Sequence, residues 1–138
     1  MIKNGVDFMF IMGDKMDKIK ANNLNPVVLA FVGDAVYSLF VREQLTFLTD
    51  CKTGELNKLA TKKVNAVAQA ELVNKIIPLL TEEELSVFKR ARNAKKPTKA
   101  KHASVSQYNL ATGFEAVIGY LYILGEMERL NYLLNLGD

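Results

Sequence analysis

The chain has 138 residues, and 49% of them are hydrophobic, which is enough for one compact domain with a buried core. Cys51 is the only cysteine and His102 the only histidine, which excludes an internal disulfide and a Cys/His metal site and is typical of a reducing cytosol. No apolar run reaches the length of a membrane span, and the formal net charge of +3 is spread unevenly along the chain.

We interpret residues 1–20 as a partly disordered N-terminal extension that precedes a single domain over residues 21–138. The first predicted helix begins at Asn25 and Pro26, residue types favoured at the N-cap and at the first helical position, and runs to about Gln44. This helix is apolar nearly all round, so we expect it to be central and buried.

One carboxylate, Asp34, interrupts the apolar run LAFVGDAVY of this helix. A buried ionised group persists only when a cation, a metal or hydrogen-bond donors compensate the loss of water. The alternative is a structural acid that a neighbouring arginine or backbone amide satisfies.

The remaining segments also favour helices. Apolar residues at helical spacing predict one helix from near Gly54 to Pro78, with Lys58 and Lys62 on its outer face. Capping boxes beginning at Thr81 and Ser104 predict two further helices, and a last short helix follows Gly125. No segment alternates strictly enough to indicate a strand, so the expected fold class is all-α.

The basic character of the chain is concentrated in residues 89–102, KRARNAKKPTKAKH. This run holds 7 of the 18 lysines and arginines and no acid, so the other 124 residues carry 11 basic and 15 acidic groups, a net charge of −4. A cationic segment on such a body suits a polyanion such as nucleic acid. The alternative is a solvated loop whose lysines only aid solubility.

A second carboxylate, Glu115, stands among small and apolar residues in ATGFEAVIG. If Asp34 and Glu115 face each other from two central helices, their oxygens could hold Mg²⁺, which activates water and stabilises charge on a phosphodiester. Sequence spacing does not show that they meet, and a capped or ion-paired structural acid at each position is the alternative.

Two motifs resemble the ribonuclease III catalytic domain. LAFVGDAVYSLFVRE is similar to the signature helix of that family, and ATGFEAVIGYLY is similar to its second acidic motif. Further matches are Gln69 with Ala70, the segment KRARNAK, and Gln107 with Tyr108. The matches span residues 24–124 in the family's order, and the pattern is closest to Mini-III, the short bacterial branch without a double-stranded-RNA-binding domain.

The resemblance implies an all-α, ribonuclease III-type helical homodimer that cleaves double-stranded RNA in the cytoplasm with Mg²⁺, leaving 5′-phosphate and 3′-hydroxyl ends. The implied substrate is precursor 23S ribosomal RNA, and a ribosomal protein that shapes this RNA is a further implied partner. Asp34 and Glu115 match the family's acids, so the resemblance implies that they are the catalytic metal ligands.

The sequence departs from the larger ribonuclease III pattern at two positions, Ala30 and Thr112, where that pattern has a second carboxylate on each helix. We therefore expect one metal per site, with waters completing its coordination.

For RNA binding we select the polar and basic residues near the basic run, with three weaker candidates outside it. The set is Lys89, Arg90, Arg92, Asn93, Lys95, Lys96, Lys99 and Lys101, and the weaker candidates are Arg42, Lys58 and Lys62. Two other classes compete: a non-catalytic RNA-binding ribosome-assembly protein of the same fold, and a helical dimerisation module with an incidental basic loop.

Overall fold

The computed structural model describes residues 14–96 and 103–137, and within these ranges it contains helices and no strand. This confirms the expected all-α class. The elements in chain order are α1 (Lys18–Asn22), α2 (Pro26–Leu48), α3 (Thr53–Val64), α4 (Ala66–Ile76), the short 3-10 helix η2 (Ile77–Leu79), α5 (Glu82–Asn93), α6 (Val105–Leu124) and α7 (Met127–Asn135).

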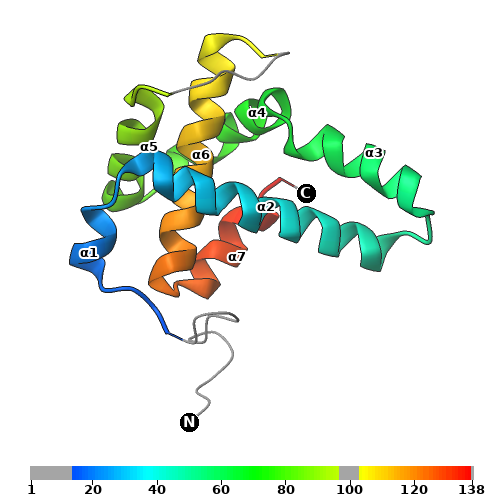
Figure 1. Cartoon of the computed structure of the whole chain (residues 1–138), viewed down its shortest axis with the longest axis horizontal. Helices are drawn as coiled ribbons and strands as arrows, with labels where there is room; N and C mark the ends of the chain where they lie inside the picture. Colours follow the sequence, from blue (N-terminus) through cyan, green and yellow to red (C-terminus); the bar gives the residue numbers. More distant parts are fainter. Residues whose placement is uncertain (1–13, 97–102, 138) are drawn as a thin grey trace.

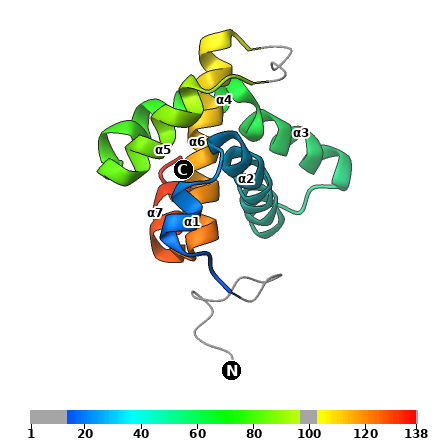
Figure 2. The same ribbon diagram turned by 60° about the vertical axis from the view of Figure 1, so that its left-hand side comes forward.

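Helix α6 runs through the middle of the molecule, and most of the other helices pack around it, whereas α3 projects to one side beside the C-terminal half of α2 (Figure 1). The long helix α2 crosses α6 and forms with it the most extensive helix pair, while α4 and α5 pack on α6 as well. A second view shows α2 and α3 on one side of α6 and α5 on the other (Figure 2). No helix in the described ranges is long and apolar enough to cross a bilayer.

Local capping chemistry sets most helix ends, as the sequence predicts. The Asn25 side chain accepts from the Val27 amide, with Pro26 at the first helical position. Both predicted capping boxes form, at Thr81 and at Ser104. Helix α6 ends at Gly125, whose φ of 73° lies in the left-handed region that glycine adopts without strain.

The prediction of a single helix from Gly54 to Pro78 is wrong, because the helix is interrupted at Asn65 and the segment forms two helices, α3 and α4. The Asn65 backbone is extended, and its side-chain oxygen accepts from the Ala68 amide to cap α4. Its side-chain amide donates to the Thr61 and Lys62 carbonyls at the end of α3. One side chain thus satisfies backbone groups at the end of α3 and at the start of α4. The sequence pattern did not indicate this break, because the apolar stripe continues across it.

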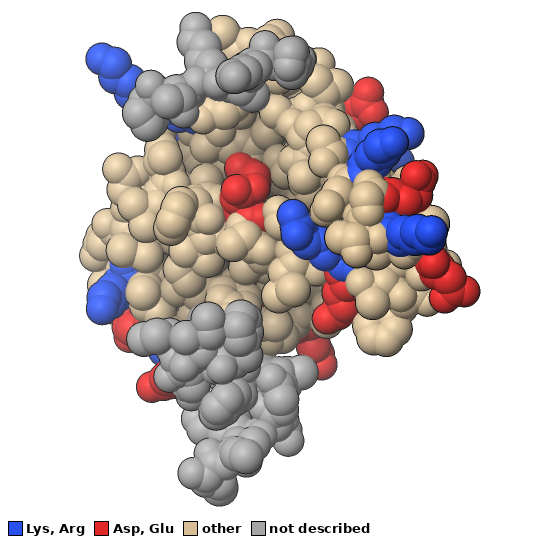
Figure 3. All heavy atoms as spheres, turned by 45° about the vertical axis from the view of Figure 1, so that its right-hand side comes forward, with Lys and Arg blue, Asp and Glu red and all other residues tan. Residues whose placement is uncertain are grey.

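Helix α2 is not buried all round, and it extends four residues beyond the predicted end at Gln44. Its buried face consists of Leu29, Ala30, Gly33, Tyr37, Val41 and Leu45. The opposite face leaves Val28, Phe31 and Leu39 exposed to 47%, 80% and 53%. Figure 3 shows that much of the surface on one side of the molecule is uncharged. Within the described ranges, this face of α2 is therefore left uncovered.

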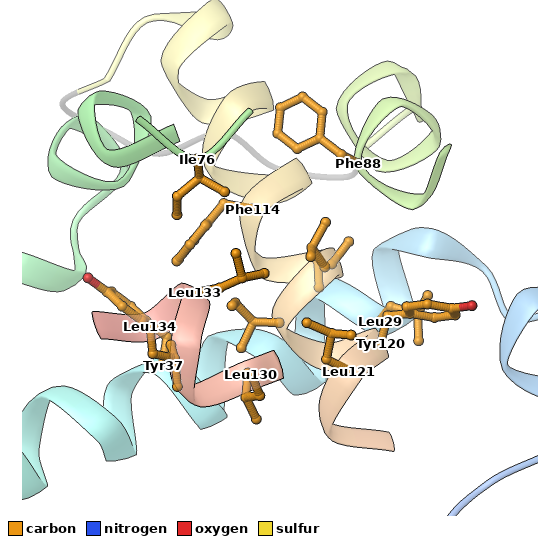
Figure 4. Close-up of a cluster of buried hydrophobic side chains, with 14 of the residues drawn as sticks. Leu29, Tyr37, Ile76, Phe88, Phe114, Tyr120, Leu121, Leu130, Leu133 and Leu134 are labelled. Atoms are coloured by element: carbon orange, nitrogen blue, oxygen red, sulfur yellow. The ribbon is translucent and has the colours of Figure 1, made fainter. Parts of the chain in front are cut away.

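The core gathers side chains from α2, α4, α5, α6 and α7 around α6 (Figure 4). Tyr37 meets Phe114 edge to face, with ring centroids 5.1 Å apart. At the margin, Arg129 of α7 donates to both Glu84 oxygens at 2.8 and 2.9 Å and to the Leu79 carbonyl. Burial alone would raise the pKa of Glu84, but these bonds and the Thr81 amide lower it below its ordinary value.

Two short elements, α1 and η2, were not among the predicted helices. The Met16 amide donates to the Ile123 carbonyl, and Lys18 pairs with Glu83 at 2.7 Å. The described residues before position 20 therefore contact the helical body. The boundary expected between an extension and a domain at residue 20 stays a prediction, and residues 1–13 lie outside the described ranges.

Candidate active site

Two glycines bring the backbones of α2 and α6 into direct contact where the helices cross. A Cβ added to Gly33 would lie 2.6 Å from the Glu115 carbonyl carbon and 2.8 Å from the Gly119 nitrogen. A Cβ added to Gly119 would lie 2.9 Å from the Gly33 nitrogen and would overlap the Leu29 carbonyl. These distances are shorter than real Cβ contacts, so only hydrogen fits at either position.

This crossing places Asp34 next to Glu115. Asp34 follows Gly33 on α2, Glu115 precedes Gly119 by one turn on α6, and the two carboxyl groups are close enough for Asp34 to raise the pKa of Glu115. A glycine inside a helix costs about 0.5–1 kcal/mol relative to alanine, so two glycines beside two acids are a readable signal for close approach. The sequence reasoning singled out the acids and missed these glycines.

The two carboxyl groups differ in their surroundings. Asp34 is exposed, so the expectation that it lies buried in an apolar helix is wrong for the isolated chain. Glu115 is half-buried. Burial raises the pKa of Glu115 to about 9, the hydrogen bond and negative charge of Asp34 act in the same direction, and the Gln69 hydrogen bond opposes them. Without a cation, Glu115 therefore keeps its proton at neutral pH.

A third side chain, Gln69, completes the cluster from α4. It is 1% exposed, and its Nε2 donates to Glu115 Oε2 at 3.3 Å and to the Val64 carbonyl at 3.1 Å. The sequence reasoning used Gln69 only as a family match. A polar residue on the apolar face of a helix was the signal that could have marked it.

The pair suits a small divalent cation in its donor chemistry. Carboxylate oxygens are the ligands that Mg²⁺ prefers, and a cation between two carboxylates removes the repulsion that favours the protonated form of Glu115. In the described ranges no group of three or more His, Cys, Asp or Glu residues could hold a metal. The protein's own contribution from these residues is thus two carboxylates, and water or substrate would complete the coordination.

The two positions that lack the larger family's extra acids lie in the same helices and are buried. Ala30 is 5% exposed, and Thr112 is 6% exposed with its hydroxyl donating to the Tyr108 carbonyl at 2.9 Å. Neither residue offers an anionic ligand. The site is therefore poorer in negative charge than the larger family pattern.

The basic run begins on the last turns of α5, where its members differ in how they are engaged. Lys89 and Lys95 are exposed. Arg90, also exposed, donates to the Asn22 carbonyl at 3.4 Å. Arg92 donates to Asn93 at 3.1 Å and lies 5.8 Å from the centre of the Phe88 ring.

Lys96 closes the end of α5. Its ammonium donates to the Arg92 carbonyl at 2.9 Å and to the Ala94 carbonyl at 2.7 Å, and burial lowers its pKa. Lys99 and Lys101 lie outside the described ranges. Lys95 is thus the better candidate than Lys96 for contact with a phosphate.

The weaker candidates lie on other elements. Arg42 is exposed on α2, and Lys58 and Lys62 are exposed on α3. Lys62 also lines a cleft between α2 and α4 together with Lys75. On the face drawn in Figure 3, a small acidic patch is surrounded by uncharged surface, and basic and acidic side chains are interspersed to one side of it.

Comparison with known proteins gives a consistent result. Residues 27–126 match the Ribonuclease III domain family. The chain is 44% identical to Mini-ribonuclease 3 of Clostridium tetani over 128 residues, which cover 92% of this chain and 85% of the relative. It is 48% identical to Mini-ribonuclease 3 of a Thermoanaerobacter species over 114 residues, 83% of this chain and 80% of the relative.

Among solved structures, the crystal structure of protein FN1578 from Fusobacterium nucleatum is similar to this chain with a TM-score of 0.77 and 34% sequence identity. The similarity covers 87% of this chain and 94% of that one.

Proposed function

The chain belongs to the ribonuclease III family and is an endoribonuclease, and on this premise we propose that it hydrolyses double-stranded RNA with Mg²⁺ as its cofactor. The proposed substrate is the stem formed by the ends of precursor 23S ribosomal RNA, which would place the protein in the cytoplasm. The proposed products carry 5′-phosphate and 3′-hydroxyl ends. A ribosomal protein that shapes the RNA is a further proposed partner.

The observation that carries this proposal is the contact between Asp34 and Glu115 at the crossing of α2 and α6. These are the residues that would hold Mg²⁺, and the bound ion would activate water and stabilise charge on the phosphodiester. Glu115 must release its proton to become a ligand, so cation binding and proton release are coupled. Asp34 is exposed and thus reachable from solvent and substrate.

Duplex RNA is recognised mainly through its backbone, its 2′-hydroxyl groups and its shape. The exposed cations at the end of α5, Lys89, Arg90 and Lys95, suit phosphate contacts of this kind. Each phosphate contact strengthens binding without reading sequence. We propose that this segment binds the duplex and that the carboxylate pair supports hydrolysis of the phosphodiester.

A second copy of the chain is the proposed partner of the exposed face of α2. Val28, Phe31 and Leu39 lie there on the side of α2 opposite to its buried face. A two-fold contact in which the same face packs on itself would cover these side chains, and such isologous contacts are the commonest solution in homo-oligomers. Each copy would bring its own carboxylate pair.

The competing function is a ribosome-assembly protein of the same fold that binds RNA without cutting it. Two glycines and a buried glutamine arranged around two facing acids favour the catalytic reading, because a binding protein has no need for a carboxylate pair. The dimerisation module with an incidental basic loop leaves the same cluster unexplained.

Incubation of the purified chain with a perfect RNA duplex tests the proposal, once with Mg²⁺ and once with EDTA. We expect cleavage only with Mg²⁺, and loss of cleavage in Asp34→Asn, which keeps the side-chain shape and removes the charge. Glu43→Gln makes the same kind of change at an exposed acid of α2 and should cut normally. Binding of the duplex without cleavage in Mg²⁺ would favour the assembly protein.

A further inference from the structure

Gln69 occupies a position that links three helices. It belongs to α4, it is 1% exposed, and its Nε2 lies 3.1 Å from the last carbonyl of α3, that of Val64. The same nitrogen lies 3.3 Å from Oε2 of Glu115 on α6. One amide group therefore spans from the α3–α4 junction to a carboxyl group of the candidate active site.

The break at Asn65 explains why this amide has a fixed orientation. In an unbroken helix the Val64 carbonyl would accept from the Ala68 amide, but Ala68 donates to the Asn65 side chain. The backbone amide of Gln69 donates to the Asn65 carbonyl. The Val64 carbonyl is thereby left for Gln69 Nε2, and a buried carbonyl is costly when it has no donor.

The orientation in turn determines what Gln69 presents to Glu115. A carbonyl accepts and does not donate, so only the NH₂ end of Gln69 can face Val64. The second hydrogen of the same NH₂ group is then available for Glu115 Oε2. Because the side chain is buried and both hydrogens have acceptors, rotation of the amide would leave two acceptors without a donor.

We infer that Gln69 is a positioning residue of the active site: its amide, held by the Val64 carbonyl at the α3–α4 break, fixes the Glu115 carboxylate for cation binding. This inference rests on the proposed function. Oε2 of Glu115 accepts a hydrogen bond from α4, and Glu115 and Asp34 are the residues that would hold the cation. The break at Asn65 is then part of the site, because it supplies the carbonyl that orients Gln69.

The decisive variant is Gln69→Met, which keeps the length and much of the volume of the side chain and removes both hydrogen-bond donors. Mn²⁺, detected by the loss of the free-ion paramagnetic resonance signal, reports cation binding without any need for catalysis. Loss of a group that orients a metal ligand typically weakens metal binding or activity by about 10–100-fold. We expect Mn²⁺ affinity to fall within this range and the Mg²⁺ concentration for half-maximal single-turnover cleavage to rise in parallel.

A merely structural role predicts a different pattern, which Val73→Ala provides as a matched control. Val73 lies on the same helix and is 1% exposed, and its replacement by alanine removes packing but no hydrogen-bond donor. We expect this control to lower the melting temperature and to leave Mn²⁺ affinity within about 2-fold. Apparent duplex affinity in EDTA should stay unchanged in both variants.

Gln69→Leu is a second variant of similar volume that has no hydrogen-bond donor and adds no charge. It should show the same loss of Mn²⁺ affinity, and it decides the matter if Gln69→Met does not fold. The inference is overturned if a folded Gln69 variant without a donor binds Mn²⁺ and cleaves RNA like the unaltered chain. If the unaltered chain itself neither binds Mn²⁺ nor cuts a duplex, the proposed function fails first, and the two failures are thus distinguishable.

Discussion

Substitution of Gly33 by alanine should separate the two carboxylates that the α2–α6 crossing brings together. The added Cβ would start 2.6 Å from the Glu115 carbonyl carbon, whereas ordinary contact begins at 3.4 Å. The helices must therefore move apart by at least 0.8 Å at this point, and by more to clear the carbonyl oxygen. Backbone atoms cannot rotate away as a flexible side chain can, so the whole interface has to shift.

The expected stability loss of Gly33→Ala is at the upper end of overpacking, about 3 kcal/mol, because the clash lies in the most extensive helix interface. A displacement of about 1 Å at the reacting groups typically costs about 100-fold in rate. Urea unfolding and single-turnover cleavage by the folded fraction measure the two effects. Gly54→Ala is the matched control, since its Cβ meets nothing within 4 Å. It should stabilise α3 by about 0.5–1 kcal/mol.

A Gly33→Ala variant with the stability and rate of the unaltered chain would refute the reasoning. It would mean that the backbones are farther apart than a Cβ requires. Loss of stability with a normal rate in the folded fraction would separate the two consequences, because the crossing would then matter for folding and not for the carboxylate geometry.

Three further predictions concern pH, RNA and assembly. Because the pKa of Glu115 is raised from 4.5 to about 9, the metal-free protein should lose stability as pH rises between these values, where the unfolded chain has released a proton that the folded chain keeps. Asp34→Asn should reduce this loss, and stabilisation by Mg²⁺ should grow with pH. Replacing Lys89 and Lys95 by alanine should reduce the slope of log affinity against log salt for duplex RNA by about 0.7–0.9 per lost contact, with little change in single-turnover rate. Phe31→Asp, at a side chain that is 80% exposed, should convert a dimer to a folded monomer in analytical ultracentrifugation.

Each of these has a control and a contrary result. Urea unfolding in EDTA at about pH 6 and about pH 9 should show the loss, and equal stability at both would contradict the assigned proton. The double replacement of Lys20 and Lys52, two exposed lysines outside the basic run, should leave the salt slope unchanged. A stable dimer of Phe31→Asp, or a monomer of the unaltered chain at micromolar concentration, would argue against contact through α2.

Local chemistry made several helix ends predictable. The capping boxes at Thr81 and Ser104 and the glycine at 125 act within a few residues, so their signals stand in adjacent letters of the sequence. The break at Asn65 escaped prediction because the apolar stripe continues across it, although asparagine is among the best N-cap residues. Apolar periodicity indicates which face of a helix is buried. It does not reveal where one helix ends and another begins in a new direction along the same buried face.

The exposed face of α2 shows a second limit of prediction from the sequence. The helix is apolar nearly all round, which indicates burial on several sides, but not by which partner. Only the tertiary structure shows that this chain covers the face with Leu29 and Val41 and leaves Phe31 in solvent. The apolar residues all round the helix predict that a partner covers it on several sides. The packing shows which face remains uncovered.

The sequence by itself determined the helical class, the family and the two acids, because composition, capping and motif spacing depend on neighbouring residues. The tertiary structure decided that Asp34 is exposed, that it lies beside Glu115 across 81 positions of sequence, and that Gln69 donates a hydrogen bond to Glu115 from a third helix. Those contacts depend on how closely two helices approach, and that approach depends on hydrogen in place of a side chain at Gly33 and Gly119. Distances between remote residues are set by packing: a glycine signals that something approaches closely, but no local pattern says which helix it is.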